Sequence, residues 1–334
     1  MSGNVEFSIE PSSGAPHLFI LGAGASRAAL PNGDRNGYQL PLLDNLVEVL
    51  GLENLLKDRG ADGVGANFEA FYSDLHEANP DDPLLYQLEE KVRNYFARLE
   101  LPSEPTIYDY LVLSLREKDF IATFNWDPFL LQAATRNARI ATLPRMAFLH
   151  GGATLGICDD DYLKGPLPGT CSKCGNPLRP SRLLFPVKDK DYDVDSHISG
   201  EWSGLQAALN SAYIVTIFGF GAPETDAKAV SIMKNAWSET GKRDLEEIEI
   251  IDIRPRDELV EKWSPFIVRS HYQVTDDFFN SMVSRFPRRT CEAFFNRTLL
   301  LQLSKENPPP RLERLAELQA WFRPLIEDEE QLSA

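Results

Sequence analysis

The sequence HLFILGAGAS at residues 17–26 decides the fold class. Its first half, His17–Leu21, is a short apolar run typical of a strand buried on both faces, and Gly22–Ser26 follows as a tight turn that opens a helix. Two closely spaced glycines let a backbone approach a pyrophosphate, and Ser26 offers a hydroxyl donor. The loop could also be only a tight connection, because Arg27 stands where the common dinucleotide-binding fingerprint has its third glycine.

Four further apolar runs predict strands, and stretches with helical periodicity separate them. They are Phe120–Phe124, Ala147–His150, Tyr213–Gly219 and Glu247–Ile253. Strands that alternate with helices indicate βαβ units, hence an α/β fold with a Rossmann-like parallel sheet and helices on both faces. Ligands bind such sheets at the carboxyl ends of the strands, so the residues after each run form the candidate site.

A chain of 334 residues exceeds a typical single domain, which predicts a core with insertions. We expect a core domain over residues 14–270, with a helical insertion at about 31–118 and a small module at about 153–198. Residues 271–334 are expected to form a C-terminal helical extension that ends in a polar tail from Glu327. Its expected helices, over Asp276–Arg323, are the candidate surface for an oligomer or a partner protein.

Composition limits the partners and the compartment. A net charge of −16 repels phosphate polymers, so we expect no direct contact with nucleic acid. No apolar run approaches the roughly 20 residues that span a bilayer, and the N-terminal stretch has neither a basic start nor an apolar signal core. These features predict a cytoplasmic protein without a membrane segment.

Asn125 and Asp127 follow the second predicted strand, in the stretch TFNWD at residues 123–127. An asparagine at this strand end could hold a ribose hydroxyl or position a water. Asp127 could contact the same ligand, or it could only cap the helix that begins after Pro128. Both interpretations of Asp127 are open from the sequence.

His150 ends the third predicted strand, directly before two glycines. An imidazole ordinarily titrates near neutral pH, which suits it to take a proton from a ribose hydroxyl or a water. A lone histidine is often structural instead. The hypothesis of a general base therefore depends on the convergence of several strand ends at one site.

Two later strand ends add candidate ligand contacts. GFGAPETD at residues 219–226 combines two glycines, Gly219 and Gly221, with acids suited to capping a helix. Asp252 ends the fifth predicted strand, where a carboxylate would accept hydrogen bonds from both hydroxyls of an adenosine ribose and repel the 2′-phosphate of NADP. The alternative for Asp252 is a solvated acid at a strand end.

The cysteines indicate a small module with a possible metal site. Cys171 and Cys174 have CxxC spacing, and Cys158 precedes them by thirteen positions. A closed structural zinc site needs four ligands, Cys291 is far along the chain, and His197 or an aspartate would have to complete the shell. Zinc is one interpretation, and a metal-free remnant of such a module, favoured by the missing fourth ligand, is the other.

Taken in order, these motifs resemble the sirtuin family, which binds NAD. The resemblance implies that the glycine loop grips the NAD pyrophosphate, that the Asn and Asp of the second motif surround the nicotinamide ribose, and that the histidine is the base. The residues that inherit these catalytic roles are Asn125, Asp127 and His150, and the candidate NAD contacts are Gly22, Ala23, Gly24, Ser26, Thr123, Gly219, Gly221 and Asp252.

The chain departs from protein-deacylating sirtuins where those enzymes bind nicotinamide and peptide. Residues 27–43 replace their Pro-Asp-Phe-Arg element, residues 183–192 replace their Phe-Gly-Glu segment, and Gly219–Gly221 replaces their Gly-Thr-Ser motif. These changes resemble the sirtuin-like branch of bacterial anti-phage defence, whose members hydrolyse NAD. The expected function is an NAD glycohydrolase of antiviral defence that works as an oligomer or with a partner protein. A protein lysine deacylase and a non-catalytic sensor of NAD or ADP-ribose are the alternatives.

Overall fold

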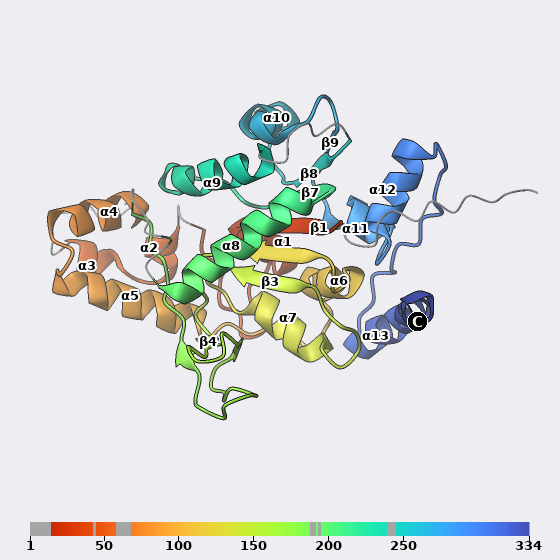
Figure 1. Ribbon diagram of the computed structural model, residues 1–334. Coiled ribbons are helices and arrows are strands. Elements are labelled where there is room, and N and C mark those ends of the chain that lie inside the picture. Colours follow the sequence, from red (N-terminus) through yellow and green to blue (C-terminus); the bar gives the residue numbers. More distant parts are fainter. Residues whose placement is uncertain are drawn as a thin grey trace, which may run out of the picture.

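The computed structural model describes residues 15–42, 45–57, 68–187, 192, 195–238 and 245–333. Its centre is a six-stranded sheet of order β3-β2-β1-β7-β8-β9, in which all neighbouring strands run parallel (Figure 1). The order reverses direction between β1 and β7, as in doubly wound sheets. The predicted Rossmann-like parallel sheet is confirmed. Its strands are β1 (His17–Leu21), β2 (Phe120–Thr123), β3 (Arg145–Phe148), β7 (Ile214–Phe218), β8 (Glu247–Ile251) and β9 (Tyr272–Thr275).

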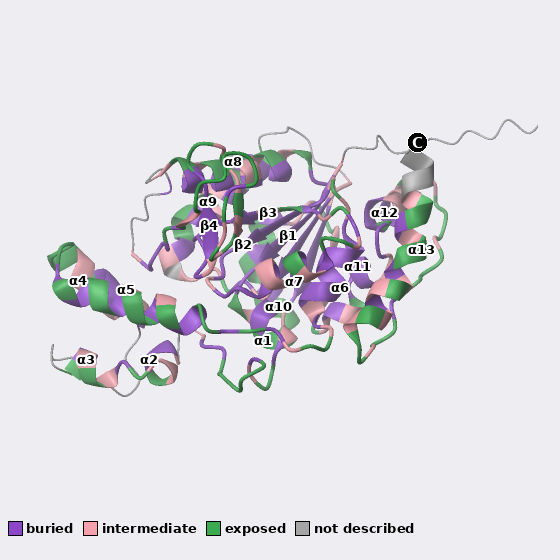
Figure 2. Cartoon of the chain, turned by 90° about the horizontal axis from the view of Figure 1, so that it is seen from below, coloured by how far each residue is buried: buried purple, intermediate pink, exposed green. Residues whose placement is uncertain are grey.

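Helices cover both faces of the sheet, which explains why every residue of β1, β7 and β8 is buried (Figure 2). Alternate side chains of a strand point to opposite faces. Accordingly, Leu18 and Ile20 of β1 belong to one hydrophobic cluster and Phe19 and Leu21 to another. The first cluster includes α8 (Ser196–Ser211), α9 (Ala227–Ser238) and α10 (Arg256–Trp263), and the second includes α1 (Ala23–Ala29), α6 (Ile107–Ser114) and α7 (Phe129–Asn137).

The predicted helical insertion lies to one side of the sheet in both views of the chain (Figures 1 and 2). It contains α2 (Leu46–Val49), α3 (Glu53–Lys57), α4 (Phe68–Ala78) and α5 (Pro83–Phe96). The longest of them, α5, begins where Asp82 accepts a hydrogen bond from the backbone N–H of Leu84 at 2.9 Å. Residues 43–44 and 58–67 of the expected insertion lie outside the described residues. Although it falls within the expected insertion, α6 packs against α7 and shares the hydrophobic cluster of Phe19 and Leu21.

The C-terminal segment is built into the same core. β9 pairs with β8, so the sheet continues past the expected boundary at residue 270. Leu318 and Phe322 of α13 (Leu315–Ser333) are fully buried in the cluster that contains Phe19. The expected polar tail from Glu327 is helical up to Ser333, where α13 ends. The remaining elements here are η2 (Ser264–Phe266), η3 (Phe278–Asn280), α11 (Met282–Arg285), α12 (Thr290–Leu299) and α13 (Leu315–Ser333).

The expected small module contains a separate antiparallel sheet of order β5-β4-β6. Its strands are β4 (Leu155–Ile157), β5 (Lys164–Pro166) and β6 (Arg179–Pro180). Residues 188–191 and 193–194 of the expected module lie outside the described residues. Among the helices of the described ranges, none has the length and apolar composition that crossing a bilayer requires.

Candidate functional site

A cavity of about 830 Å³ lies at the carboxyl ends of the parallel strands, where the strand order reverses. This volume is in the range of small-molecule binding sites. Ten of the candidate residues line it: Gly22, Ala23, Gly24, Ser26, Asn125, Asp127, His150, Gly219, Gly221 and Asp252. Thr123 does not; its hydroxyl accepts a hydrogen bond from the backbone N–H of Asn125 at 3.0 Å and so holds the loop after β2.

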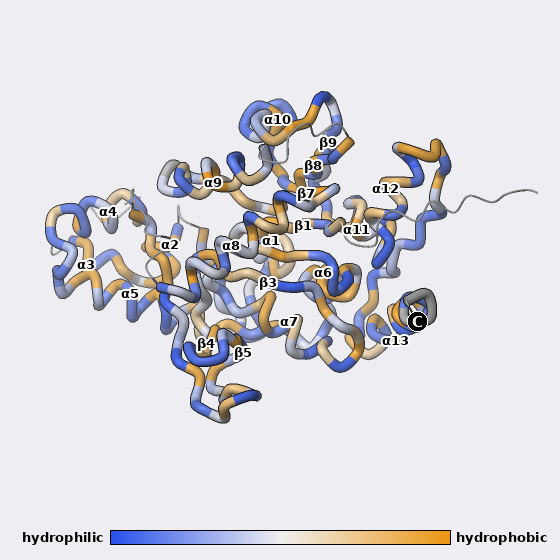
Figure 3. Tube along the Cα trace, in the orientation of Figure 1, coloured by the Kyte–Doolittle hydropathy of each residue, from blue (hydrophilic) through white to orange (hydrophobic). Residues whose placement is uncertain are grey.

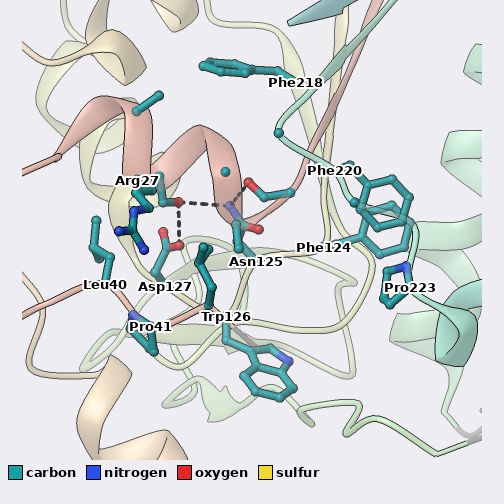
Figure 4. Close-up of a pocket in the computed structure, with 18 of the residues that line it drawn as sticks. Arg27, Leu40, Pro41, Phe124, Asn125, Trp126, Asp127, Phe218, Phe220 and Pro223 are labelled. Atoms are coloured by element: carbon teal, nitrogen blue, oxygen red, sulfur yellow. Dashed lines mark hydrogen bonds between the residues drawn. The ribbon is translucent and has the colours of Figure 1, made fainter. Parts of the chain in front are cut away.

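Contacts within the protein fix the orientation of the Asn125 side chain (Figure 4). Its Nδ2 donates to the carbonyl oxygen of Gly22 at 3.0 Å and to Ser26 Oγ at 3.0 Å. A carbonyl oxygen can only accept, so the atom beside Gly22 must be the amide nitrogen. Asn125 Oδ1 is therefore the atom left to meet a ligand, and it can accept a hydrogen bond from a hydroxyl group or a water.

Ser26 is the centre of a buried hydrogen-bond network behind Asn125. Its hydroxyl donates to Asp127 Oδ2 at 2.6 Å and lies 2.6 Å from the Tyr108 hydroxyl. With the bond from Asn125 Nδ2 at 3.0 Å, Ser26 has used its one proton and both lone pairs. The hydroxyl predicted to contact the ligand thus donates to Asp127 and stabilises the position of Asn125.

Asp127 is both a helix-capping residue and a buried acid. Its Oδ1 accepts from the backbone N–H of Phe129 at 3.2 Å, at the start of α7, which agrees with the capping interpretation. Burial raises the pKa of the Asp127 carboxyl to about 6, although the hydrogen bonds from Ser26 and Phe129 act in the opposite direction. The cost of desolvating the carboxylate exceeds what these two bonds return.

His150 is held in the cavity wall by aromatic rings. Phe124 lies edge-on to the imidazole with ring centroids 4.9 Å apart, and Tyr192 stacks on it at 6.3 Å. The Nε2 atom of His150 lies 3.7 Å from a carboxylate oxygen of Asp226, which belongs to the short helix η1 (Glu224–Asp226). At this distance the two groups can form an ion pair when the imidazole carries a proton.

The glycines of the first loop are required by a close approach of the chain to itself. A Cβ atom at Gly22 would lie 2.5 Å from the Cα atom of Phe220, and one at Gly24 would lie 2.8 Å from the Cα atom of Gly219. Gly219 has a φ of +61°, and a Cβ atom there would lie 2.2 Å from the backbone nitrogen of Ala25. Packing of the two loops therefore explains these glycines without any ligand.

The same packing uses the backbone donors of the first loop. The N–H groups of Gly22 and Gly24 donate to the carbonyl oxygens of Phe218 and Gly219, each at 3.0 Å. The N–H group of Ala25 donates to the carbonyl oxygen of Gly22 at 2.9 Å. The prediction that this backbone cradles a pyrophosphate therefore needs other donors in support.

Asp252 faces the cavity from the end of β8 and is paired with Arg254. The guanidinium donates to one carboxylate oxygen from Nε at 3.1 Å and to the other from Nη2 at 2.7 Å. This fork fixes the plane of the carboxylate and leaves further lone pairs for ribose hydroxyls. It also reduces the charge repulsion that the sequence predicts between Asp252 and a 2′-phosphate.

The cysteine module brings together four side chains that could bind a metal ion: Cys158, Asp161, Cys171 and Cys174. Their ligand atoms all lie within 4.8 Å of one another. Cys158 Sγ is 3.6 Å from Cys174 Sγ, and Cys171 Sγ is 3.2 Å from an Asp161 oxygen. A tetrahedral zinc with Zn–S bonds of about 2.3 Å separates its sulfur ligands by about 3.8 Å, so the set fits zinc.

The fourth ligand in this set is Asp161. His197, the other residue considered for that place, lies on α8 with its Nε2 atom 3.7 Å from Glu201 Oε1. Cys291 is buried on α12. The objection that a fourth ligand is missing therefore does not hold.

Sequence reasoning missed two residues of the site, Tyr108 and Arg27. Tyr108 lies on α6, 17 positions before Asn125, and no local pattern marks its hydroxyl as a partner of Ser26 and Asn125. In the sequence, Arg27 stands out only because it replaces the third glycine of the dinucleotide-binding fingerprint, but in the structure it lines the cavity. A basic residue after a glycine loop was the available signal for Arg27.

Comparison with known proteins gives similarity in structure alone. No family model matches the chain, and no curated protein matches it. A structure titled "The Structural basis of Sirtuin Substrate Affinity" has a TM-score of 0.42 and 14% identity, covering 84% of this chain and 94% of that chain. A "Sir2 homolog-NAD complex" has a TM-score of 0.38 and 14% identity, covering 84% and 90%. The function must therefore be inferred from the residues of the cavity itself.

Proposed function

We propose that the protein is an NAD glycohydrolase that cleaves NAD to nicotinamide and ADP-ribose. The observation that carries the proposal is that an acceptor oxygen, Asn125 Oδ1, and an imidazole, His150, line one cavity at the reversal of strand order. A dinucleotide lying across this point would place its nicotinamide half over the β2 and β3 ends and its adenosine half over the β7 and β8 ends. Asp252 then meets the adenosine ribose.

Asn125 and His150 divide the work of hydrolysis. Asn125 Oδ1 accepts a hydrogen bond from the attacking water and orients it, while His150 takes up the proton that this water loses. The oxygen of the water bonds to the anomeric carbon of the ribose as the bond from that carbon to nicotinamide breaks. Nicotinamide leaves with the electron pair, and Asp226 stabilises the protonated His150.

Residues 183–192, which replace the Phe-Gly-Glu segment of deacylating sirtuins, favour water over a lysine peptide as the second reactant with NAD. Leu183, Leu184 and Phe185 are buried, and Phe185 stacks on Tyr72 of α4 with ring centroids 5.0 Å apart. These side chains pack into the protein's own core, so little apolar surface is left on them to hold a peptide. Protein lysine deacylation and non-catalytic sensing of NAD or ADP-ribose are the alternatives.

Product analysis with purified protein separates the three functions. With NAD alone, a glycohydrolase releases nicotinamide and ADP-ribose in equal amounts, a deacylase needs an acyl-lysine peptide and forms acylated ADP-ribose, and a sensor binds without turnover. We expect Asn125→Ala and His150→Ala each to lower turnover by about 100-fold or more. Asn94→Ala and His271→Ala, at positions outside the cavity, should leave it unchanged. Full activity in both cavity variants would refute the mechanism.

We further propose that the reaction serves bacterial anti-phage defence by depleting cytoplasmic NAD, under control of oligomerisation or a partner protein. The order of the motifs and their departures from deacylases support this role. In phage-challenged bacteria, the NAD pool should fall with the wild-type protein and persist with Asn125→Ala. Light scattering, combined with turnover measured over a range of protein concentrations, tests control by assembly.

The cysteine module is proposed to hold a structural zinc with Cys158, Asp161, Cys171 and Cys174 as ligands. All four places of a tetrahedral shell are filled by protein, which is typical of structural rather than catalytic sites. Zinc would then stabilise the small antiparallel sheet without taking part in the chemistry of the cavity.

A further inference from the structure

The cavity proposed to hold NAD is rich in carboxylates. Five acids line it: Glu69, Asp127, Asp226, Asp252 and Asp276. The pyrophosphate of NAD carries two negative charges, so this surface must supply compensating donors somewhere. Three backbone N–H groups of the glycine loop, those of Gly22, Gly24 and Ala25, already donate to carbonyl oxygens of the chain. The fourth N–H group, that of Ala23, is a donor without a formal charge, so the compensating positive charge must come from side-chain cations.

Two arginines, Arg27 and Arg254, line the cavity among the described residues. The charge of Arg254 is already paired, because its guanidinium donates to both carboxylate oxygens of Asp252 and its Nη1 atom lies 3.5 Å from Glu258 Oε1. Arg27 is in a different state. Within the described part of the chain, its side chain has no hydrogen bond or ion pair, and the residue is exposed.

The position of Arg27 suits an anion bound beside the glycine loop. It is the residue directly after Ser26 on α1, and its side chain extends into the cavity toward Leu40 and the side that Asp127 also lines (Figure 4). A guanidinium offers five donors in a planar fork that matches the oxygens of a phosphate. Arg27 thus has the positive charge that the backbone lacks, together with donors that its side chain does not use within the described residues.

We infer that Arg27 binds the pyrophosphate of the dinucleotide and is the main determinant of its affinity for the cavity. The inference rests on the proposed function, because it assumes that a dinucleotide is the ligand. It assigns the anion to a side chain, whereas the glycine-loop motif assigns it to the backbone. Salt should therefore weaken binding steeply in the wild-type protein and less in a variant without this charge.

Calorimetric titration with ADP and with adenosine tests the inference without relying on turnover. We expect Arg27→Ala to weaken ADP binding by about tenfold or more, since charge-assisted bonds to phosphate are lost, and to leave adenosine binding unchanged. Arg27→Lys should fall between the two, because it keeps the charge and loses the fork. Arg35→Ala, an exposed arginine whose Nη1 lies 3.8 Å from Glu100, is the matched control and should bind ADP normally.

The outcomes separate this inference from the proposed function. If Arg27→Ala binds ADP within about twofold of the wild type while the wild type releases nicotinamide from NAD, the inference is wrong and the glycohydrolase stands. If ADP binding depends on Arg27 while NAD is not cleaved, the anion site stands and the glycohydrolase is wrong. Failure of the wild-type protein to bind ADP would also overturn the inference.

Discussion

At the scale of single residues, the buried carboxyl of Asp127 links the site to stability. Burial raises its pKa from the ordinary 3.8 to about 6, so the folded protein binds this proton more tightly than the unfolded chain does. The free energy of unfolding is therefore expected to fall as the pH rises through this interval, and the loss is complete above about pH 6. A shift of about two pKa units corresponds to about 3 kcal/mol.

Asp127→Asn removes this penalty and keeps one oxygen, which accepts the hydrogen bond from Ser26. Its amide nitrogen replaces the oxygen that accepts from the N–H of Phe129, so loss of this cap offsets part of the gain. We expect the variant to gain stability over the wild type by up to about 3 kcal/mol between about pH 4 and pH 7, measured by urea unfolding at each pH. Asp257→Asn, an exposed acid on α10, should follow the wild-type profile. Parallel profiles for the wild type and Asp127→Asn would show that the carboxyl is not penalised.

At the scale of elements, the sequence predicts strands where both faces are covered and fails where they are not. The apolar runs of β1, β7 and β8 are fully buried, so their composition alone marks them. β9 lies at the sheet edge with all four residues half-buried, and YQVT has no apolar run that would mark it. This is why the predicted core ended at residue 270.

In the candidate site too, the local sequence marks some residues, whereas contacts between distant parts of the chain appear only in the structure. Asn125 and His150 were predictable because strand ends of a parallel sheet converge on one edge. Two further partners were not predictable, because Tyr108 accepts from Asn125 and Asp161 accepts from Cys171 only through tertiary packing. The sequence also does not show that the N–H groups of Gly22 and Gly24 already donate to the chain itself. Nor does it show that Arg254 donates to both carboxylate oxygens of Asp252.

The close packing of the loops that follow β1 and β7 can be tested by substitution at Gly219. Gly219→Ala adds a Cβ atom at a φ of +61° and 2.2 Å from the Ala25 nitrogen, so backbone must move. We expect a loss of more than about 2 kcal/mol in the free energy of unfolding. Gly221→Ala is the matched control, since a Cβ atom there would meet no neighbour within 4 Å in the described part of the chain. Equal stability of the two variants would contradict the tight packing of these loops.

The cysteine module gives a second test at this scale. We expect about one zinc per chain by metal analysis, and its loss in Cys171→Ser and Asp161→Ala, because a closed site needs all four ligands. Asp160→Ala, an exposed neighbour of the cluster, should keep the metal. Removal of zinc should lower the unfolding temperature, and a full zinc content in Asp161→Ala would exclude this residue as the fourth ligand.

At the scale of the whole molecule, the C-terminal segment divides into a buried part and an exposed part. α13 lies against α6 and α7, where Gln319 Nε2 donates to Asn137 Oδ1 at 3.0 Å. In contrast, Leu301 and Leu303, which follow α12, are 87% and 91% exposed, and Figure 3 shows this stretch as hydrophobic. The expected role as a partner surface therefore cannot involve the apolar side of α13, which the protein's own core already covers.

Phe322→Ala and Leu303→Ala distinguish these two parts by stability. Phe322 is fully buried in the cluster that contains Phe19 and Leu21 of β1, so its truncation is expected to cost about 3–5 kcal/mol in the free energy of unfolding. Leu303 has almost no buried surface to lose, and its truncation should change stability by less than about 0.5 kcal/mol. Urea unfolding of both variants decides whether residues 271–334 fold as part of the sheet domain. If Phe322→Ala were as stable as the wild type, α13 would be an element appended to the sheet domain and not part of its core.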